Sequence, residues 1–195
     1  MTRIRSPFRR AVQADALVLA ELVNYAGQGM PFYLWGKLVQ AGETPWDVGR
    51  RRAARETGSF SYRNAVVVEH EGQCAGCLIG YEIPDDPAPI GTDMPAMFVP
   101  LQQLENMAPS TWYVNVLAVL PQFRNKHHGT ELLDLADETG RALGKLGMSV
   151  IVSDGNLGAR RLYERQGYRA VALRPMIKEG WVTDGLNWVL LTKTF

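Results

Sequence analysis

The spacing of apolar and polar residues predicts strands and helices in alternation from the start of the chain. A short strand over 8–12 is followed by apolar residues at helical spacing, which indicate a helix opened by Asp15 and stopped by Gly27. Two β-rich runs, 65–69 and 75–81, flank a polar turn. This part of the chain is therefore predicted to form an antiparallel hairpin.

The second half of the chain has a helix between two buried strands, which is typical of a mixed α/β fold. The pattern predicts an apolar strand over 111–119 and a helix over 130–146 that ends at Gly147. The elements expected afterwards are a strand over 150–153, a helix over 156–166, and strands over 168–173 and 186–192. The inner side of the long helix is predicted to hold Leu132, Ala136, Thr139, Leu143 and Leu146.

Two stretches interrupt this pattern. Residues 29–46 are rich in glycine, proline and aromatic side chains and indicate an irregular, partly buried connection. Five prolines break regular structure over 84–100, and a short amphipathic helix is expected directly afterwards.

Residues 47–56 suit a helix with a basic face. This face is either simply solvated, or it attracts an acidic acceptor or a cofactor phosphate. Its basic residues are Arg50, Arg51, Arg52 and Arg55.

Composition narrows the class of protein. The 195 residues fit one domain, and with 46% hydrophobic and 21% charged residues the chain is expected to fold without a partner. Lys plus Arg total 21 against 20 for Asp plus Glu, which gives no general attraction for nucleic acid. No apolar run reaches the roughly 18 residues of a membrane span, and residues 1–5 lack the apolar run of a signal peptide. We therefore expect a cytoplasmic protein without membrane or nucleic-acid partners.

The two cysteines, Cys74 and Cys77, are too few to hold the fold together as a disulfide framework. Residues three apart on a regular strand point to opposite faces, so the two thiols could not both ligate one zinc ion. No metal is expected.

The candidate ligand-binding residues cluster where the buried strand 114–119 is followed by a polar loop and then a helix. The first amides of a helix lack intrahelical partners and lie at the positive end of its dipole, so a loop wrapped over that end can hold a phosphate. Gly129 would let the backbone approach such a ligand closely, and Arg124 and Lys126 would supply positive charge.

This segment resembles the pyrophosphate loop of the GNAT superfamily, which reads Gln/Arg-x-x-Gly-x-Gly/Ala between a strand and a helix. Arg124, Gly129 and Thr130 match that pattern, whereas His127 takes the place of the first glycine. His127 either reaches a phosphate itself or reshapes the loop. A phosphate nest depends mainly on backbone amides, so the departure is tolerable.

A second GNAT signature follows at the expected distance. Residues 156–168 resemble Asn-x-x-Ala-x-x-Leu/Phe-Tyr-x-x-x-Gly-Phe/Tyr almost position for position. The resemblance implies an α/β fold of the α+β type, with a mixed, mostly antiparallel sheet of six or seven strands and helices on both faces. It implies a single acetyltransferase domain over 1–195, with the cofactor part at 111–168 and acceptor-side segments at 28–60 and 84–110.

The resemblance also implies the function and the residues that carry it. The chain would be an N-acetyltransferase that moves acetyl from acetyl-CoA to an amine of a small molecule, peptide or protein within a ternary complex. Tyr163 matches the tyrosine that protonates the departing thiolate, and Asn156 would bond pantetheine or simply cap its helix. The remaining cofactor-binding residues are expected to be Leu117, Ala118, Val119, Arg124, Asn125, Lys126, His127, His128, Gly129 and Thr130.

The sequence leaves the general base and the assembly state open. Asn115 stands where some GNAT members carry a glutamate on the central strand, and an amide cannot take up a proton at neutral pH. The proton could pass through water to Glu82, Asp85 or Glu105, or the amine could arrive neutral. A homodimer is common for such domains. The alternative to an enzyme is a non-catalytic module that binds or senses acyl-CoA.

Overall fold

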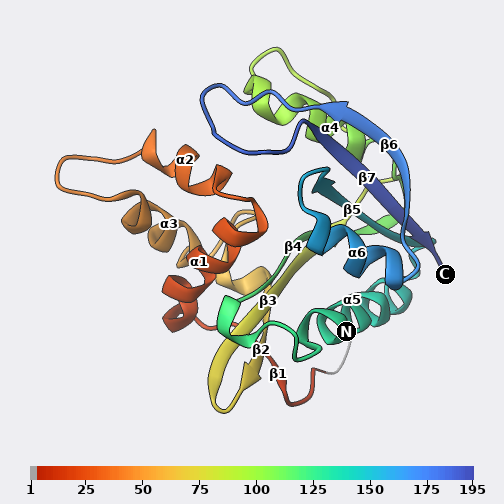
Figure 1. The fold of residues 1–195 in the computed structure, drawn as a ribbon, viewed down its shortest axis with the longest axis horizontal. Coiled ribbons are helices and arrows are strands. Elements are labelled where there is room, and N and C mark those ends of the chain that lie inside the picture. Colours follow the sequence, from red (N-terminus) through yellow and green to blue (C-terminus); the bar gives the residue numbers. More distant parts are fainter. Residues whose placement is uncertain (1–3) are drawn as a thin grey trace. The chain divides into compact units, whose positions relative to one another are not determined.

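The computed structural model describes residues 4–195, and Met1–Arg3 lie outside the described residues. Within the described part, seven strands form a mixed, mostly antiparallel sheet in the order β1-β2-β3-β4-β5-β7-β6 (Figure 1). The strands are β1 (Phe8–Arg10), β2 (Ala65–His70), β3 (Gln73–Glu82), β4 (Thr111–Val119), β5 (Gly147–Ser153), β6 (Arg169–Pro175) and β7 (Asn187–Thr194). The α-helices are α1 (Ala16–Ala26), α2 (Met30–Gly36), α3 (Pro45–Ala53), α4 (Val99–Glu105), α5 (His128–Ala142) and α6 (Leu157–Arg165). The predicted fold class is confirmed.

The chain divides into two compact units. Among the described residues, unit 1 holds 81–115 and 133–195, and unit 2 holds 4–80 and 116–132. Strand β4 therefore begins in unit 1 and ends in unit 2. None of the described helices is long and apolar enough to span a bilayer.

Unit 2 contains the antiparallel strands β1, β2 and β3 and the helices α1, α2 and α3. Strand β1 pairs with β2, and β2 pairs with β3 across a turn at Glu71 and Gly72. The predicted hairpin is thus confirmed. Helix α1 buries apolar side chains at helical spacing and packs against α3 and α2. The buried side chains are Ala16, Leu19, Ala20, Leu22 and Val23.

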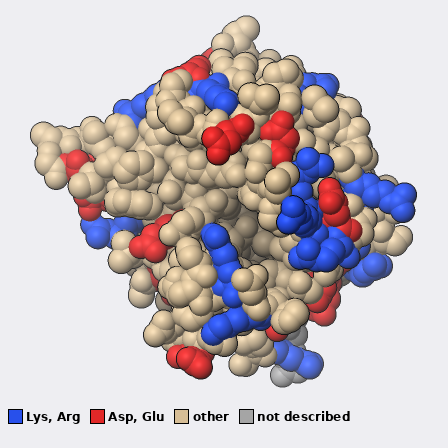
Figure 2. All heavy atoms as spheres, in the orientation of Figure 1, with Lys and Arg blue, Asp and Glu red and all other residues tan. Residues whose placement is uncertain are grey.

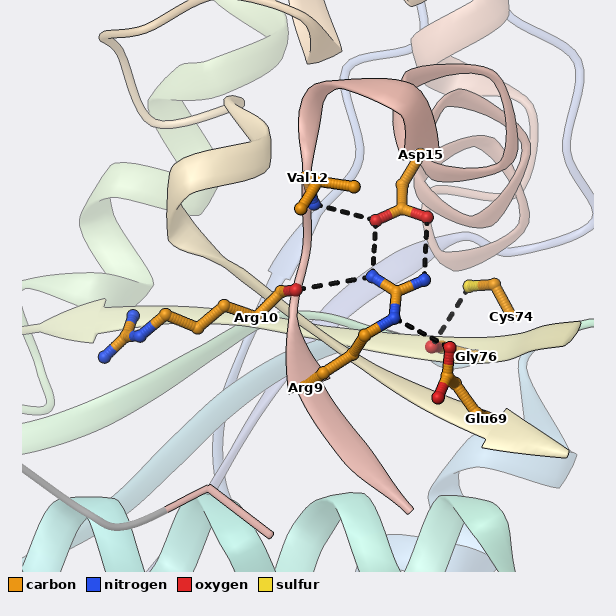
Figure 3. Close-up of polar contacts among 7 residues, drawn as sticks. All are labelled: Arg9, Arg10, Val12, Asp15, Glu69, Cys74 and Gly76. Atoms are coloured by element: carbon orange, nitrogen blue, oxygen red, sulfur yellow. Dashed lines mark hydrogen bonds and ion pairs between the residues drawn. The ribbon is translucent and has the colours of Figure 1, made fainter. Parts of the chain in front are cut away.

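A charged network ties β1 to the start of α1 and to β2 (Figure 3). The Arg9 guanidinium donates to both carboxylate oxygens of Asp15, at 2.7 and 3.0 Å, and to Glu69 at 2.7 Å. The backbone amide of Val12 also donates to Asp15, at 2.8 Å. Burial alone would raise the pKa of Asp15, but the hydrogen bonds from Arg9 and Val12 hold it below its ordinary value.

Unit 1 is centred on β5, β7 and β6. Strand β7 pairs antiparallel with both of its neighbours, and β4 runs parallel to β5. Helix α4 packs against β5, β6 and β7. Its position confirms the short helix predicted after the proline-rich stretch.

The structure corrects two details of the sequence interpretation. Residues 30–36 form helix α2 instead of an irregular connection, because Trp35 is buried there, stacks on Phe60 with ring centroids 6.0 Å apart and meets Trp46 edge-on at 6.1 Å. Helix α5 ends at Ala142, and Gly144 follows with a φ of +70°. Leu143 and Leu146 therefore lie beyond the helix and are exposed, contrary to the prediction.

Candidate active site

The second half of β4 carries the strand residues predicted to meet the cofactor. Ala118 is buried, whereas Leu117 and Val119 are half-buried on the opposite side of the strand. The pairing of β4 with β5 ends at Val114, although both strands continue. Beyond that residue, no pairing of β4 with β5 is recorded among residues 4–195, so backbone groups on this edge are available to a ligand.

Glycine is required where β3 passes this part of β4. A Cβ atom at Gly76 would lie 2.6 Å from the carbonyl oxygen of Ala118 and 3.1 Å from a methyl group of Val119. The backbone amide of Leu120 donates to the carbonyl of Ala75 at 2.9 Å. The close approach of β3 fixes the strand immediately before the loop.

The loop after β4 has the backbone shape of an anion nest. Phe123 is buried and anchors its first turn, and α5 begins at His128. Asn125 and His127 both adopt left-handed backbone conformations, with φ of +61° and +65°. His127 therefore takes the conformation that glycine favours, although it carries a side chain.

The amides of this loop remain without backbone partners. Within the described part of the chain, no backbone hydrogen bond is recorded from the amides of residues 125–130. The amide of Glu131 is the next one bonded, to the carbonyl of His127 at 3.0 Å. A run of unpaired amides at a helix start, shaped by alternating left-handed residues, is an arrangement that binds phosphate.

The two predicted cationic side chains of the loop make contacts within unit 2. The Arg124 side chain donates to the carbonyl of Val119 at 3.2 Å, and its guanidinium lies 5.7 Å from the Tyr25 ring centre. Lys126 contacts the ring nitrogen Nε2 of His70 at 2.9 Å. Both cations lie at the loop and are exposed, so they remain accessible to an anion.

A histidine pair braces the loop from β2. His128 is buried, and its Nε2 lies 3.2 Å from Nδ1 of His70 while its Nδ1 lies 3.0 Å from Glu131. A lysine ammonium can only donate, so the chain Lys126 to His70 to His128 to Glu131 is satisfied with both histidines neutral. His70 lies in the hairpin, far from the loop in sequence, and was not among the predicted site residues.

In unit 1, Asn156 caps the start of helix α6, and Tyr163 lies in its last turn. The side-chain oxygen of Asn156 accepts from the amide of Ala159 at 3.2 Å, so the expected N-cap is present. Its amide nitrogen is still available as a donor. Tyr163 is buried, and its ring packs 5.6 Å from Tyr168. Burial raises the pKa of Tyr163 well above its ordinary value.

A tyrosine and glutamate cluster also lies in unit 1. The hydroxyl of Tyr81 donates to Glu105 at 3.1 Å, and the Tyr81 ring packs 5.1 Å from Tyr113. Burial raises the pKa of Tyr113, and the charges of Glu105, Tyr81 and Tyr163 raise it further. The four side chains are thus electrostatic neighbours.

The loop residues 117–130 belong to unit 2, whereas Asn156 and Tyr163 belong to unit 1. Among residues 4–195, no group of three or more histidine, cysteine or acidic side chains could hold a metal ion.

Two arginines of α3 form ion pairs with neighbours in unit 2: Arg50 pairs with Asp47 and Arg51 with Glu43.

The face of the molecule drawn in Figure 2 carries acidic and basic side chains interspersed, without a field of one sign. A phosphate-bearing ligand would therefore find its favourable charge at the loop itself and not over this face as a whole. A half-paired strand, a backbone nest and a helix start are features typical of proteins that bind a phosphate-bearing ligand through the main chain.

Comparison with known proteins identifies the family. The model of the GNAT acetyltransferase family matches residues 34–168, and the chain belongs to this family. No curated protein matches the chain.

Several solved structures share the fold. One described as an acetyltransferase is 23% identical with a TM-score of 0.64, and the match covers 96% of this chain and 98% of that one. An N-acetyltransferase from Staphylococcus aureus Mu50 is 17% identical with a TM-score of 0.64, covering 95% and 98%. A GNAT family acetyltransferase from Elizabethkingia anophelis, with acetyl-CoA bound, is 15% identical with a TM-score of 0.51, covering 67% and 75%.

Proposed function

We propose that this protein transfers the acetyl group of acetyl-CoA to an amine by direct attack within a ternary complex. The observation that carries the proposal is the run of unpaired amides over 125–130, shaped by the left-handed Asn125 and His127. A diphosphate bridging these amides would accept several charge-assisted hydrogen bonds at the positive end of α5. The acetyl-CoA bound to the Elizabethkingia relative supports the same donor here.

The strand before the loop would hold the pantetheine arm. Leu117, Ala118 and Val119 would offer main-chain groups on the edge that β5 leaves unpaired, so the arm adds to β4 like a short strand. A backbone amide near Leu117 or Val119 would then polarise the thioester carbonyl and stabilise the tetrahedral oxyanion. Arg124, Lys126 and the amides of His127 to Thr130 would complete the phosphate contacts.

Asn156 and Tyr163 would act at the sulfur end of the cofactor. The free amide nitrogen of Asn156 would donate to pantetheine while its oxygen caps α6. Tyr163 would donate its hydroxyl proton toward the departing thiolate. Because its raised pKa keeps Tyr163 protonated, the residue can serve as a donor but not as a base.

The proton transfer from Tyr163 has an unfavourable equilibrium. An ordinary phenol of pKa about 10 giving its proton to a thiolate of pKa about 8.5 costs roughly 2 kcal/mol, and burial of Tyr163 increases that cost. The benefit must therefore come mainly from a hydrogen bond that strengthens as the carbon–sulfur bond breaks. Segments 28–60 and 84–110 are proposed to select the acceptor, which is an amine of a small molecule, a peptide or a protein.

The test combines binding and turnover. Isothermal calorimetry should show binding of CoA and of acetyl-CoA, and free thiol should appear when acetyl-CoA meets a panel of a lysine peptide, a peptide with a free N-terminus, and small alkyl and aromatic amines. Failure to bind either form of the cofactor would refute the proposal. Binding without thiol release for any amine would instead favour an acyl-CoA-sensing module.

A further inference from the structure

We infer that Glu105, acting through the hydroxyl of Tyr81, receives the proton that the acceptor amine loses when it attacks the thioester. The inference rests on the proposed function, since it adds a base to that reaction. Glu105 is the last residue of α4, and Tyr81 lies next to the end of β3. Their bond of 3.1 Å joins the two elements within unit 1.

The position of this pair connects it to the proposed acid. The ring of Tyr113, on β4, packs against Tyr81, and electrostatic coupling of Tyr113 to Glu105, Tyr81 and Tyr163 adds to the rise in its pKa that burial causes. Tyr81 and Glu105 are half-buried, so a ligand can still reach them, whereas Tyr113 and Tyr163 are buried. The accessible base and the buried acid are thus both neighbours of one tyrosine.

Glu105 differs from the other two carboxylates near this part of the chain. Glu82 is exposed and forms an ion pair with Lys145 at 2.6 Å, and Asp85 is exposed and accepts a hydrogen bond from Ser110. A paired carboxylate is a weakened base. No ion pair to Glu105 is recorded among residues 4–195, and its one hydrogen-bond donor is Tyr81.

The environment makes Glu105 a stronger base than an exposed glutamate. Burial raises its pKa above the ordinary value of 4.5, an effect that the hydrogen bond from Tyr81 offsets in part. A half-buried carboxylate that has no cation beside it is stabilised when it takes up a proton or meets a positive group. A neutral amine that attacks the thioester supplies both, because its nitrogen becomes positively charged as the bond forms and then loses a proton.

The step balances for a neutral amine, because Tyr163 gives one proton to the departing thiolate while Glu105 takes one from the amine, and proton exchange with water then restores both residues. The amine nitrogen forms the bond to the thioester carbon and its N–H bond breaks. That proton goes to the oxygen of Tyr81 as the hydroxyl proton of Tyr81 passes to Glu105, so Tyr81 is neutral before and after the step. Burial strongly raises the pKa of Tyr81, which excludes a lasting phenolate and requires the two transfers to be concerted.

The groups that face α4 define the expected pH dependence. The strands that pack on this helix, β5, β6 and β7, carry the cations Arg169, Arg174 and Lys193, and the ends of β3 and β4 in unit 1 add Tyr81, Glu82 and Tyr113. Arg169 is exposed, Arg174 bonds Gln103, Lys193 bonds Asp137 and Glu82 pairs with Lys145. The tyrosines remain protonated at working pH, so Glu105 alone should set the acidic limb of kcat.

The experiment measures kcat against pH for Glu105→Gln, Tyr81→Phe and the matched control Glu82→Gln, using acetyl-CoA and the fastest acceptor of the amine panel. Wild type and Glu82→Gln should both show an acidic limb above pH 4.5. Glu105→Gln should lose this limb, lower kcat at pH 7 by roughly a hundredfold or more, and leave the KM for acetyl-CoA unchanged. Tyr81→Phe should lower kcat similarly.

The neutral fraction of the amine sets a pH dependence that wild type and Glu105→Gln share. An alkyl amine has a pKa of about 10.4, so each unit of pH below that value changes its neutral fraction about tenfold. The kcat/KM of both proteins for the amine should therefore rise about tenfold per pH unit between pH 7 and 9, and the ratio of the two values isolates the effect of Glu105. The melting temperature of Glu105→Gln at pH 8 should be no lower than that of wild type, because the variant removes a buried charge.

Two results would overturn the inference and can be told apart from failure of the proposed function. If wild type releases thiol but Glu105→Gln keeps the acidic limb and the kcat, the base lies elsewhere. If Tyr81→Phe turns over like wild type, the relay is wrong. Absence of thiol release by the wild-type protein with every amine would overturn the proposed function and the inference together.

Discussion

The conformation of His127 allows a direct test of the phosphate loop. Its φ of +65° lies in the left-handed region, which costs a side-chain-bearing residue about 1–2 kcal/mol. His127→Gly removes this cost but adds about 0.5–1 kcal/mol of chain entropy, so the net gain in unfolding free energy lies between about 0 and 1.5 kcal/mol. A gain of about 1 kcal/mol corresponds to a rise in melting temperature of roughly 2–4 °C for a chain of this size.

The opposite substitution removes the nest. Proline fixes φ near about −65° and has no amide hydrogen, so His127→Pro cannot adopt the native loop and deletes one donor. Loss of one charge-assisted hydrogen bond costs about 1.5–3 kcal/mol, which weakens CoA binding by roughly 10- to 150-fold. His127→Ala keeps the backbone demand and removes only the imidazole.

Calorimetric titration of CoA into the three variants separates the backbone from the side chain. His127→Gly is expected to bind within about twofold of wild type, and His127→Pro at least about tenfold more weakly. If His127→Ala also binds like wild type, the imidazole makes no phosphate contact. Wild-type affinity in His127→Pro, with its fold intact by circular dichroism, would refute a backbone-based phosphate site.

Three further predictions concern turnover and stability. Tyr163→Phe should lower kcat roughly 10- to 150-fold, the value of one charged hydrogen bond, and leave the Kd for CoA unchanged by calorimetry; an unchanged kcat would exclude Tyr163 as the donor. The hydrogen bonds from Arg9 and Val12 hold the pKa of Asp15 below its ordinary value of 3.8, so they stabilise the fold at pH values above 3.8. The unfolding free energy should therefore fall as the pH drops below that value. In urea titrations, the unfolding free energy of Arg9→Met should depend less on pH than that of the exposed control Arg10→Met. Equal pH dependence in the two variants would contradict this. Gly49→Ala places a Cβ 2.5 Å from the Trp35 ring and should cost about 1–3 kcal/mol, measured by the same titrations against Gly158→Ala, where nothing lies within 4 Å.

The sequence predicted those elements whose pattern is local. Strand 111–119 was predicted with the bounds that the structure gives it, because eight of its nine residues, all but Asn115, are β-forming or apolar and Pro121 follows soon after its end. The hairpin at 65–82 follows from two β-rich runs on either side of Glu71 and Gly72. Helix α2 could not be inferred in the same way, because the burial of Trp35 by Phe60 and Trp46 is a tertiary contact.

The helix after the loop shows a different limit. Either Gly144 or Gly147 could end the helix, and the apolar Leu143 and Leu146 favoured an end at Gly147. The structure ends the helix before Gly144, whose positive φ turns the chain, so the two leucines become exposed. Similarly, His70 contacts Lys126 and His128 across more than fifty residues, and nothing in the local pattern of the hairpin marks it as a partner of the loop.

Burial raises the pKa of both proposed proton carriers, and the same shift serves opposite roles. For Tyr163 it moves the pKa further above neutral pH, so the residue stays protonated and can only donate. For Glu105 it moves the pKa upward from 4.5 toward neutral pH, which increases its strength as a base while it remains ionised. Desolvation favours the neutral, protonated form of both residues, so their roles differ because the ordinary pKa of tyrosine lies above working pH and that of glutamate lies below it. Asn115 on the central strand could not replace Glu105, because an amide side chain has no titration that desolvation could adjust.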